Sequence, residues 1–446
     1  MKILKFGGTS LGDAARIRHA AEIAGRQENC VVVCSAMAGV TNKLEEVNYH
    51  WQIGENARAA DVLQLIQNRF EVQCRELFPD ESHFIEILMV LRKLFQPVHK
   101  YLQKKYKGAR SGEVLALGEI ATSRLFHEYL NYTGISSGFV NITGIIQLNA
   151  QEEPVVKDIT KRMHAMGAFR EPGIYITQGF ICRDSGGRIT NLKRGGSDYT
   201  ATLLGAALHA GSIEIWTDID GLHNNDPRFI QDTLPIPELS YAEAAELAYF
   251  GAKILHPSCV WPARESNIPI LLKNTFQPEA QGTLINSHIV PDGIRAVAAK
   301  DNITIIRVAS GRMFNAYGFL KNLFAIFDRF RIPVDVVTTS EVSVSLTIED
   351  TSRLEEVCDE LRKLGRVSVE SRQAIVCIVG NINPFLAEIL HAVKPFHIRM
   401  VSLGASANNV TLVLPYEQKV PALMSLQNLL NHSKITTPDP CIQLQA

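Results

Sequence analysis

The chain has 446 residues, 46% of them hydrophobic, and its 45 Lys and Arg residues nearly balance its 46 Asp and Glu residues. This length predicts two or three domains with large cores, and a net charge of −1 without a basic stripe argues against nucleic acid or an anionic membrane as a principal partner. A start without a signal-peptide layout, no apolar run of the ~18 residues that a membrane helix needs, and cysteines without a CxxC pair predict a cytoplasmic protein with reduced cysteines and no metal site.

The first ten residues, MKILKFGGTS, predict a β-strand that ends at a phosphate-binding turn. Lys5 lies at the end of the apolar run, and Gly7 and Gly8 follow it closely. Such a turn brings bare backbone N–H groups and a fixed positive charge to one point, which suits a polyphosphate. Taken alone, the same residues are as typical of a tight β-to-α turn with a solvated lysine.

A second strand is predicted at Cys30–Cys34 (CVVVC), followed by the loop SAMAGVTN. A short apolar run without polar alternation is typical of a parallel strand that is buried on both faces. Ser35 and Thr41 then lie beyond the carboxyl end of this strand. That edge is where open α/β sheets bind their ligands.

The pattern between residues 43 and 107 is helical and charged, and it predicts a mostly structural helical insertion. The sequence LGEIATSRL then predicts a helix that carries Glu119. A lone glutamate in such a pattern is more often on a solvated helix face, so Glu119 carries no weight by itself.

Residues 173–201 combine a strand, a hairpin and a glycine-rich entry into a helix. GIYITQGFI predicts the strand, DSGG the hairpin turn and NLKRGGSDYTA the helix start. Arg194, Ser197 and Asp198 surround the two glycines of that start. Arginine forms a bidentate fork with a carboxylate, and an aspartate beside a catalytic lysine would hold its ammonium in place.

A further strand, SIEIW, leads into Thr217, Asp218 and the turn-rich sequence DGLHNNDPR, which contains His223 and Arg228. The later sequence FGAKILHP places Lys253 at a helical position after a glycine. A lysine on a helix is usually solvated, so the interest of Lys253 comes only from the neighbouring motifs.

Seven of these segments, in this order, resemble the amino-acid kinase family and, within it, the aspartate kinases: KFGGTS, SAMAGVTN, LGE, ITQGFI, RGGSDYTA, WTDIDGL with NDPR, and FGAKILHP. The resemblance implies transfer of the γ-phosphoryl group of ATP to the side-chain carboxylate of L-aspartate. The product, 4-phospho-L-aspartate, opens lysine, threonine, methionine and diaminopimelate biosynthesis. A carboxylate is already a nucleophile at neutral pH, so catalysis needs positioning and charge neutralisation rather than a general base.

The resemblance also implies a role for each motif residue. Lys5 would neutralise the transferring phosphoryl group, and Asp198 would orient Lys5. The remaining residues divide into an aspartate pocket and an ATP site: Ser35, Thr41, Glu119, Arg194 and Ser197 for aspartate, and Lys5, Gly7, Gly8, Thr217, Asp218, His223, Arg228 and Lys253 for ATP. Mg²⁺ would bridge the ATP phosphates rather than sit in a cage of protein ligands.

Two positions depart from the family pattern. Lys193 stands where many members have a glycine, and His223 stands where many have a tyrosine. Lys193 adds a side chain and a charge to a tight loop, so nucleotide or aspartate affinity is expected to differ from the family norm.

The C-terminal third contains an internal repeat with an offset of 66 residues, which pairs Phe319 with Phe385 and Val344 with Val410. Each copy reads as strand, loop, helix, strand, turn, strand. This order resembles a tandem pair of ACT domains, the small βαββαβ modules that bind amino acids. The resemblance assigns the strand near 303–308 to the second module, which makes the first an insertion; two unrelated α/β units are the alternative.

Only the first copy carries two acids, Asp335 and Glu341, at positions that are apolar in the second copy. Paired carboxylates could hold an ammonium group, and the N–H groups that open the helix of this copy could take an α-carboxylate. The segment GFLKNLFAIFDRFRIPVDVVTTSEVSVSLTI resembles the regulatory module of lysine-sensitive aspartate kinases, which implies L-lysine as effector at Phe319, Leu320, Asp335, Ser340 and Glu341. Solvated acids on loop and strand ends are the alternative.

We therefore expect an α/β protein: an amino-acid kinase fold, with an open and mostly parallel sheet between helices, over residues 1–290, and a tandem ACT regulatory region over 291–446. The first ACT module is expected at about 309–374 and the second at about 375–440, together with the strand near 303–308.

The expected protein is monofunctional, with no fused homoserine dehydrogenase, and it pairs through ACT sheet edges as a homodimer or dimer of dimers. A relative that acts on another carboxylate, such as glutamate, is one alternative. An amino-acid sensor with a disabled kinase domain is another, although the intact site residues speak against it.

Overall fold

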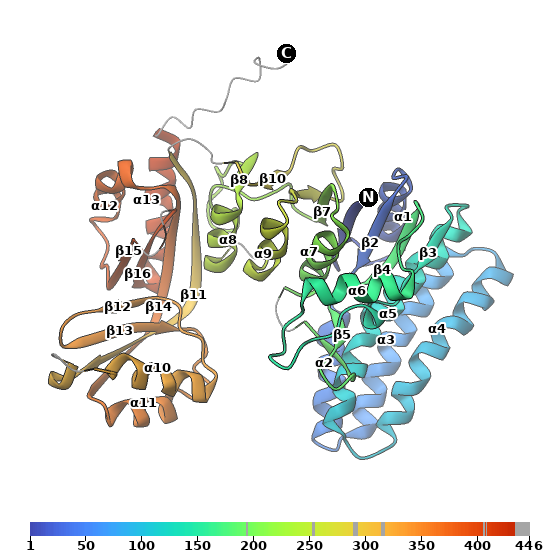
Figure 1. The fold of residues 1–446 in the computed structure, drawn as a ribbon, viewed down its shortest axis with the longest axis horizontal. Coiled ribbons are helices and arrows are strands. Elements are labelled where there is room, and N and C mark those ends of the chain that lie inside the picture. Colours follow the sequence, from blue (N-terminus) through green and yellow to red (C-terminus); the bar gives the residue numbers. More distant parts are fainter. Residues whose placement is uncertain are drawn as a thin grey trace, which may run out of the picture. The chain divides into compact units, whose positions relative to one another are not determined.

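The computed structural model describes residues 1–192, 195–251, 255–288, 293–313, 317–404, 406 and 408–432. The chain packs into two compact units, both drawn in Figure 1. The first unit comprises Met1–Leu222, Pro237–Tyr241 and Leu255–His288, and the second comprises His223–Ile236, Ala242–Ile254 and Ile289–Ala446.

The first unit is built on an open, mostly parallel sheet. Within the described residues the sheet has eight strands in the order β3-β4-β2-β1-β7-β9-β10-β8. Neighbours from β3 to β9 are parallel, β10 is antiparallel to β9, and β8 is parallel to β10. The strands are β1 (Lys2–Phe6), β2 (Cys30–Cys34), β3 (Ser137–Phe139), β4 (Ile174–Gln178), β7 (Ser212–Thr217), β8 (Glu238–Ser240), β9 (Ile270–Asn274) and β10 (Thr283–Asn286). The parallel sheet predicted from CVVVC and its neighbours is confirmed, and all five residues of β2 are buried.

Capping residues mark the ends of several helices in this unit. Asp13 caps the first helix by accepting a hydrogen bond from the Arg16 N–H at 2.9 Å, and Gly167 ends another in the left-handed conformation. The described helices of this unit are α1 (Ala14–Gly25), α2 (Val40–Gln52), α3 (Asn56–Leu77), α4 (Glu81–Leu102), α5 (Ser111–Tyr132), α6 (Val156–Met166), α7 (Gly196–Leu208) and α9 (Pro257–Glu265). A short hairpin of β5 (Ile181–Arg183) and β6 (Ile189–Asn191) turns at the predicted DSGG.

The helical insertion predicted between residues 43 and 107 is present as most of α2 together with α3 and α4, the long blue helices of Figure 1. Its apolar side chains, among them Trp51, Phe70 and Phe95, join the same core as β1 and β2. The insertion is therefore packed as part of the catalytic unit. Within the described ranges no helix is both long and apolar enough to cross a bilayer.

The second unit contains an antiparallel sheet of six strands in the described residues, in the order β12-β13-β11-β14-β16-β15. Its elements are α8 (Tyr241–Phe250, of which Ala242 onward belongs here), β11 (Gly293–Ala309), α10 (Phe319–Phe330), β12 (Val337–Thr339), β13 (Ser343–Ile348), α11 (Leu354–Arg362), β14 (Arg366–Asn381), α12 (Leu386–Val393), β15 (Met400–Leu403), β16 (Asn409–Pro415) and α13 (Lys419–His432). In Figure 1, α10 and α11 lie beside one half of this sheet, and α12 and α13 lie beside the other half.

Each half of the sheet has its own core, as expected for two repeated modules. Side chains of α10 and α11 pack with β13 and the second part of β11, whereas those of α12 and α13 pack with β14, β16 and the first part of β11. The long strands β11 and β14 run through both halves. The repeat read from the sequence is thus present in the fold.

The strand near 303–308 lies in the first module, which corrects its assignment to the second. Residues 304–309 of β11 pair with β13 of the first module. Residues 293–300 of the same strand pair instead with residues 375–381 of β14, beside β16. The second module therefore receives a strand from just upstream, because one continuous strand serves both halves.

Two segments that precede residue 290 pack in the second unit. The predicted domain boundary at residue 290 therefore divides the sequence, but the two packed units do not follow it. One is His223–Ile236, whose Ile230 is buried in the core formed with α12 and α13. The other is Ala242–Ile254, which contains most of α8.

Candidate functional site

The predicted site residues of the first unit gather where four parallel strands end. Lys5 and Phe6 of β1 stand beside Val33 and Cys34 of β2 on one side and beside Ile215 and Trp216 of β7 on the other. In turn, β2 pairs with β4 in the same register. Gly7, Ser35 and Gly179, which follow β1, β2 and β4, and Thr217, which ends β7, therefore share one edge of the sheet, where open α/β sheets bind ligands.

Lys5 is held at this edge by an ion pair. Its Nζ lies 2.7 Å from Oδ1 of Asp198, in the first turn of α7, and their side chains are only 11% and 15% exposed. Asp198 also favours the helix, since a negative charge near an N-terminus opposes the positive end of the helix dipole. A lysine fixed by one carboxylate keeps donors free for a phosphoryl oxygen. The alternative of a solvated lysine at a tight turn is excluded.

Three glycines allow close contacts at this edge of the sheet. A Cβ atom on Gly7 would lie 3.5 Å from the Lys5 Nζ, so the ammonium passes directly over that residue. A Cβ on Gly8 would lie 2.8 Å from the Ala36 carbonyl, and one on Gly179 would lie 2.3 Å from Ser197 Oγ. Side chains at the last two positions would separate the loops that follow β1, β2 and β4.

Glu119 is buried beneath the loop after β2 rather than solvated. Its residue is 3% exposed, and Oε1 accepts a hydrogen bond from the Ala36 N–H at 3.2 Å. Oε2 is also buried and has no hydrogen-bond partner among the described residues. Burial raises the pKa of Glu119 to about 8, and the Ala36 N–H only partly offsets this. The free oxygen thus suits a bound ammonium group, and the alternative of a solvated helix face is excluded.

The other predicted aspartate contacts of this unit lie at helix starts. Thr41 is in the first turn of α2, directly after the Ser35 loop, and Ser197 is in the first turn of α7 and is 7% exposed. Gly195 precedes α7 in the left-handed conformation, with φ of 73°. Arg194 and the departure at Lys193 lie outside the described residues.

The predicted ATP residues divide between the two units. Thr217 ends β7, and its hydroxyl donates to Asp218 at 3.1 Å. His223 and Arg228 belong to the second unit. Arg228 folds back on Asp226 with contacts of 2.6–3.1 Å, and a ring nitrogen of His223 contacts Thr233 Oγ1 at 2.8 Å. Lys253 lies outside the described residues.

Sequence reasoning missed Arg69, which ties two of the site loops together. From α3 its guanidinium donates to the Ala38 carbonyl at 2.6 Å and to the Gly12 carbonyl at 2.8 Å. These carbonyls belong to the loops that follow β2 and β1. Arg69 lies in the helical insertion without any motif around it, so nothing in the local sequence singles it out.

Comparison with known proteins accords with this geometry. Residues 1–274 match the amino acid kinase family. The lysine-sensitive aspartokinase 3 of Escherichia coli is 34% identical over 96% of this chain and 98% of its own length.

The chain belongs to the amino acid kinase family, among its aspartokinases.

Plant relatives and solved structures agree with this membership. Aspartokinase 1 of Arabidopsis chloroplasts is 32% identical over 92% of this chain and 77% of its own length. The structure of E. coli aspartokinase III with aspartate and ADP, in its R-state, has a TM-score of 0.83 at 33% identity and covers 97% of this chain and all of that one. The same enzyme with lysine and aspartate, in its T-state, has a TM-score of 0.79 over 96% and 99%.

Five residues of this aspartokinase were predicted to bind the effector, and four of them form part of the wall of a single cavity. A cavity of about 390 Å³, within the range of small-molecule sites, lies at the start of α10. Its walls offer an acid, a base and the N-terminus of a helix, and they are formed by Met313, Tyr317, Gly318, Phe319, Leu320, Lys321, Ser340 and Glu341.

Asp335 is not part of this cavity, and the predicted pairing of Asp335 with Glu341 within one chain is wrong. The Asp335 N–H bonds the carbonyl of Thr347 at one end of the β12–β13 hairpin, whereas Glu341 lies in its turn. Six extended residues span roughly 20 Å. One lysine molecule cannot bridge both carboxylates of the same chain in this conformation.

Asp335 is instead neutralised by its own chain. Oδ1 lies 2.9 Å from Lys300 Nζ and accepts a hydrogen bond from the Tyr249 hydroxyl at 2.9 Å. Oδ2 is buried without a hydrogen-bond partner in the described part of the chain. Lys300 also contacts Glu349 at 3.1 Å; burial alone would lower the pKa of Lys300, but the two carboxylates raise it. The carboxylate of Asp335, which was predicted to bind the effector, is therefore already paired with the ammonium group of Lys300.

Proposed function

We propose that this chain is an aspartate kinase that transfers the γ-phosphoryl group of ATP to the side-chain carboxylate of L-aspartate. The observation that carries the proposal is the Lys5–Asp198 ion pair at the common edge of β1, β2, β4 and β7. A fixed, nearly buried ammonium group at that point opposes the charge of a transferring phosphoryl group. The E. coli relatives that are named as aspartokinases, and solved with aspartate and ADP, support the same substrates.

Glu119 supports an amino acid as the phosphoryl acceptor. Its buried Oε2, which has no hydrogen-bond partner within the described ranges, would receive the α-ammonium group, which would also stabilise the ionised form of the carboxyl. Thr41 and Ser197 lie at nearby helix starts, and Arg194 remains the predicted clamp for the α-carboxylate. Arg194→Ala is expected to raise the KM for aspartate more than the KM for ATP, because the bidentate fork would be lost.

The divalent cation of the reaction would be Mg²⁺, carried by the nucleotide. Among the described residues no three His, Cys, Asp or Glu side chains are grouped as a metal site. Oxygen donors from ATP with few protein ligands are the usual arrangement for this ion. The chain would contribute Lys5 and the backbone of Gly7 and Gly8 at the phosphates.

ADP release measured with aspartate, with glutamate and without an acceptor tests the function. Aspartate-dependent release that exceeds the other two supports an aspartate kinase. Equal or greater release with glutamate would make the chain a kinase of another carboxylate, and no acceptor-dependent release would leave an amino-acid sensor.

We further propose feedback inhibition by L-lysine, bound at the α10 cavity. The helix N-terminus and Lys321 suit the α-carboxylate, and Glu341 suits an ammonium group. The lysine-sensitive E. coli relative supports this effector. Asp335 lies outside this cavity; it enters the proposal as an acid for a lysine molecule held by a second copy of the chain, and it becomes available only when Lys300 leaves it.

A cytoplasmic homodimer or dimer of dimers completes the proposal. β12 and β15 are the two edges of the regulatory sheet, and Val401 and Leu403 on β15 are 42% and 46% exposed. Pairing of such edges hides unpaired backbone groups. The described free cysteines are all buried, which agrees with a reducing compartment. Light scattering at micromolar concentration should give at least twice the chain mass, and a monomeric mass would contradict this assembly.

A further inference from the structure

The segment His223–Ile236 leaves the first unit and returns to it. The chain leaves the first unit after Leu222, packs in the second unit, and rejoins the first at Pro237, just before β8. This excursion, as we call residues 223–236, carries His223 and Arg228, two of the predicted ATP contacts. These two predicted ATP contacts therefore pack with the regulatory unit.

The last helix, α13, holds both limbs of the excursion through Gln427. The Gln427 amide nitrogen donates to the carbonyl of Asp232 at 3.0 Å, and its oxygen accepts from Asn225 Nδ2 at 3.2 Å. Asn225 also donates to the carbonyl of Leu423, and Asn225 and Gln427 are each only 3% exposed. Buried amides with defined partners fix a backbone more firmly than exposed ones.

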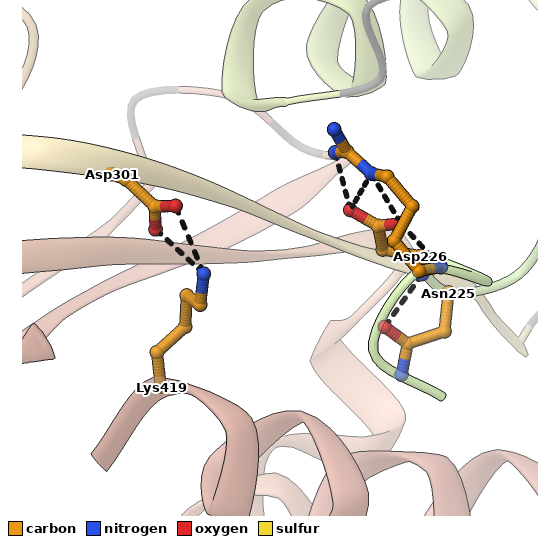
Figure 2. A network of polar contacts seen from close by, with 5 residues as sticks. Asn225, Asp226, Asp301 and Lys419 are labelled. Atoms are coloured by element: carbon orange, nitrogen blue, oxygen red, sulfur yellow. Dashed lines mark hydrogen bonds and ion pairs between the residues drawn. The ribbon is translucent and has the colours of Figure 1, made fainter. Parts of the chain in front are cut away.

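A buried lysine at the start of the same helix, paired with Asp301, contacts another part of the excursion. Lys419 is 2% exposed, and its Nζ lies 2.9 Å from the Asp301 carboxylate (Figure 2) and 3.9 Å from the centre of the Phe229 ring. Removing an ammonium group from water costs free energy, and this cost is offset only when well-placed partners surround the group. Phe229 directly follows Arg228 in the excursion.

Arg228 depends on this support for its position. Its side chain is 60% exposed, and its guanidinium contacts Asp226 and lies 5.7 Å from the centre of the Phe229 ring. Figure 2 shows Asp226 and Asn225 side by side in the excursion. The orientation of the guanidinium therefore follows the backbone between Asn225 and Phe229, which α13 holds.

We propose that Gln427 and Lys419 are positioning residues for ATP: helix α13 of the regulatory unit sets the conformation of the excursion and thereby presents Arg228 to the nucleotide. This inference rests on the proposed kinase function. It gives the regulatory unit a direct influence on ATP affinity, separate from any effect on aspartate.

The test is Gln427→Leu, which keeps the bulk of the side chain and removes both amide contacts with the excursion, together with the hydrogen bond to Asn431 of the same helix. The matched control is Ser425→Ala on the same helix, because the Ser425 hydroxyl donates to the Ala392 carbonyl of the second module at 2.7 Å. Gln427→Leu should raise the KM for ATP by about 5–10-fold, with kcat and the KM for aspartate within about twofold of wild type. Ser425→Ala should leave all three unchanged.

A second pair of variants addresses the ion pair. Lys419→Met should raise the KM for ATP as Gln427→Leu does, and Lys419→Arg should preserve it. Circular dichroism establishes that each variant is folded, and if Lys419→Met is unfolded the decision rests on Gln427→Leu. A folded Gln427→Leu with an unchanged KM for ATP overturns the inference, as does an equal rise in both Michaelis constants.

Failure of the function and failure of the inference are distinguishable by calorimetry with ADP and Mg²⁺. If wild type lacks aspartate-dependent turnover, the kinase proposal fails. ADP binding that is weaker in Gln427→Leu and normal in Ser425→Ala still supports the positioning role, whereas equal binding in all three overturns it.

Discussion

At the edge of the catalytic sheet, Lys5 is already paired with Asp198, and Glu119 has a buried oxygen without a hydrogen-bond partner among the described residues. In the regulatory unit, by contrast, Asp335 is paired with Lys300 and Tyr249. The first region presents its charges ready for a substrate. The second must give up an internal contact before an added ammonium group can reach the same acid.

The difference follows from what each region has to do. Phosphoryl transfer gains from electrostatics that are fixed before the substrate arrives, since nothing then has to reorganise in the transition state. Regulation requires two states with different affinities for the effector. An acid that exchanges one ammonium group for another provides such a pair of states.

The largest expected effect is at Lys5. Lys5→Ala should lower kcat by at least about 10²-fold, because the transferring phosphoryl group loses its charge partner. Steady-state kinetics on folded protein measures this. Lys2→Ala is the control, since Lys2 lies on the same strand but pairs with Glu214 and is 47% exposed. A folded Lys5→Ala enzyme with near-normal turnover would remove Lys5 from the mechanism.

Asp335 and Lys300 should show opposite effects on regulation. Asp335→Ala should raise the lysine concentration for half-inhibition by at least about 30-fold, since a buried charge partner is lost. Lys300→Met should lower it several-fold, because the competing internal ammonium group is gone. Inhibition assays with lysine, threonine and methionine measure both.

Regulation that is unchanged in Asp335→Ala, or wild-type inhibition by threonine alone, would contradict this assignment. Direct binding of lysine, measured with and without aspartate and ATP, separates loss of binding from loss of coupling. An effector that disfavours the active state must itself bind less well when substrates hold that state.

Glu119 should make aspartate binding depend on pH. With its pKa raised to about 8, the empty site is mostly protonated at pH 7, and binding of an ammonium group favours the ionised form. The KM for aspartate should therefore fall between pH 6.5 and 8 in wild type. Glu119→Gln should raise this KM about tenfold and abolish that pH dependence. Glu113→Gln is the control on the same helix, where Glu113 contacts Tyr101 at 2.6 Å.

The same carboxyl predicts a change in stability with pH. Between about pH 4.5 and 8 the folded protein keeps a proton on Glu119 that the unfolded chain has lost, so this residue lowers wild-type stability as pH rises. Glutamine does not titrate. The free energy of unfolding of Glu119→Gln relative to wild type should thus increase by about 2–4 kcal/mol from pH 5 to 8, measured in urea. A constant difference would show that the pKa is not raised.

The smallest expected effect is at Arg69. Arg69→Met keeps much of the packing but frees the carbonyls of Gly12 and Ala38, so both Michaelis constants should rise about 2–5-fold. Arg18→Met is the control, since Arg18 bonds the exposed carbonyl of Glu76 away from these loops. Unchanged constants would make Arg69 a purely structural residue.

Much of the catalytic region could be predicted because parallel strands place their carboxyl ends together. Apolar runs located β1, β2 and β7, and the residues that follow each run had to meet at one edge. The ion pair between Lys5 and Asp198 needed the family resemblance, since nothing in their spacing brings residues so far apart in the chain into contact.

The prediction that Asp335 and Glu341 form a pair failed because the distance between two residues depends on whether the backbone between them is extended. Asp335 and Glu341 are close in sequence, but β12 holds them at opposite ends of a hairpin. The partner of Asp335 is Lys300, from a strand whose two halves serve two modules, and no local pattern announces that pairing. Arg69 was missed for a similar reason: its partners are backbone carbonyls, which have no signature in the sequence.

The excursion at residues 223–236 also limits how this protein can be divided. A chain cut near residue 290 would keep the excursion but lose the strands and helices around Ile230, and the amide of Asn225 would lose Leu423 and Gln427. The truncated chain would expose apolar side chains that are normally buried and amide groups that have lost their hydrogen-bond partners. Such surfaces favour aggregation over activity. Each of the two units is therefore expected to depend on segments from both sides of residue 290, and neither is expected to be fully competent when produced alone.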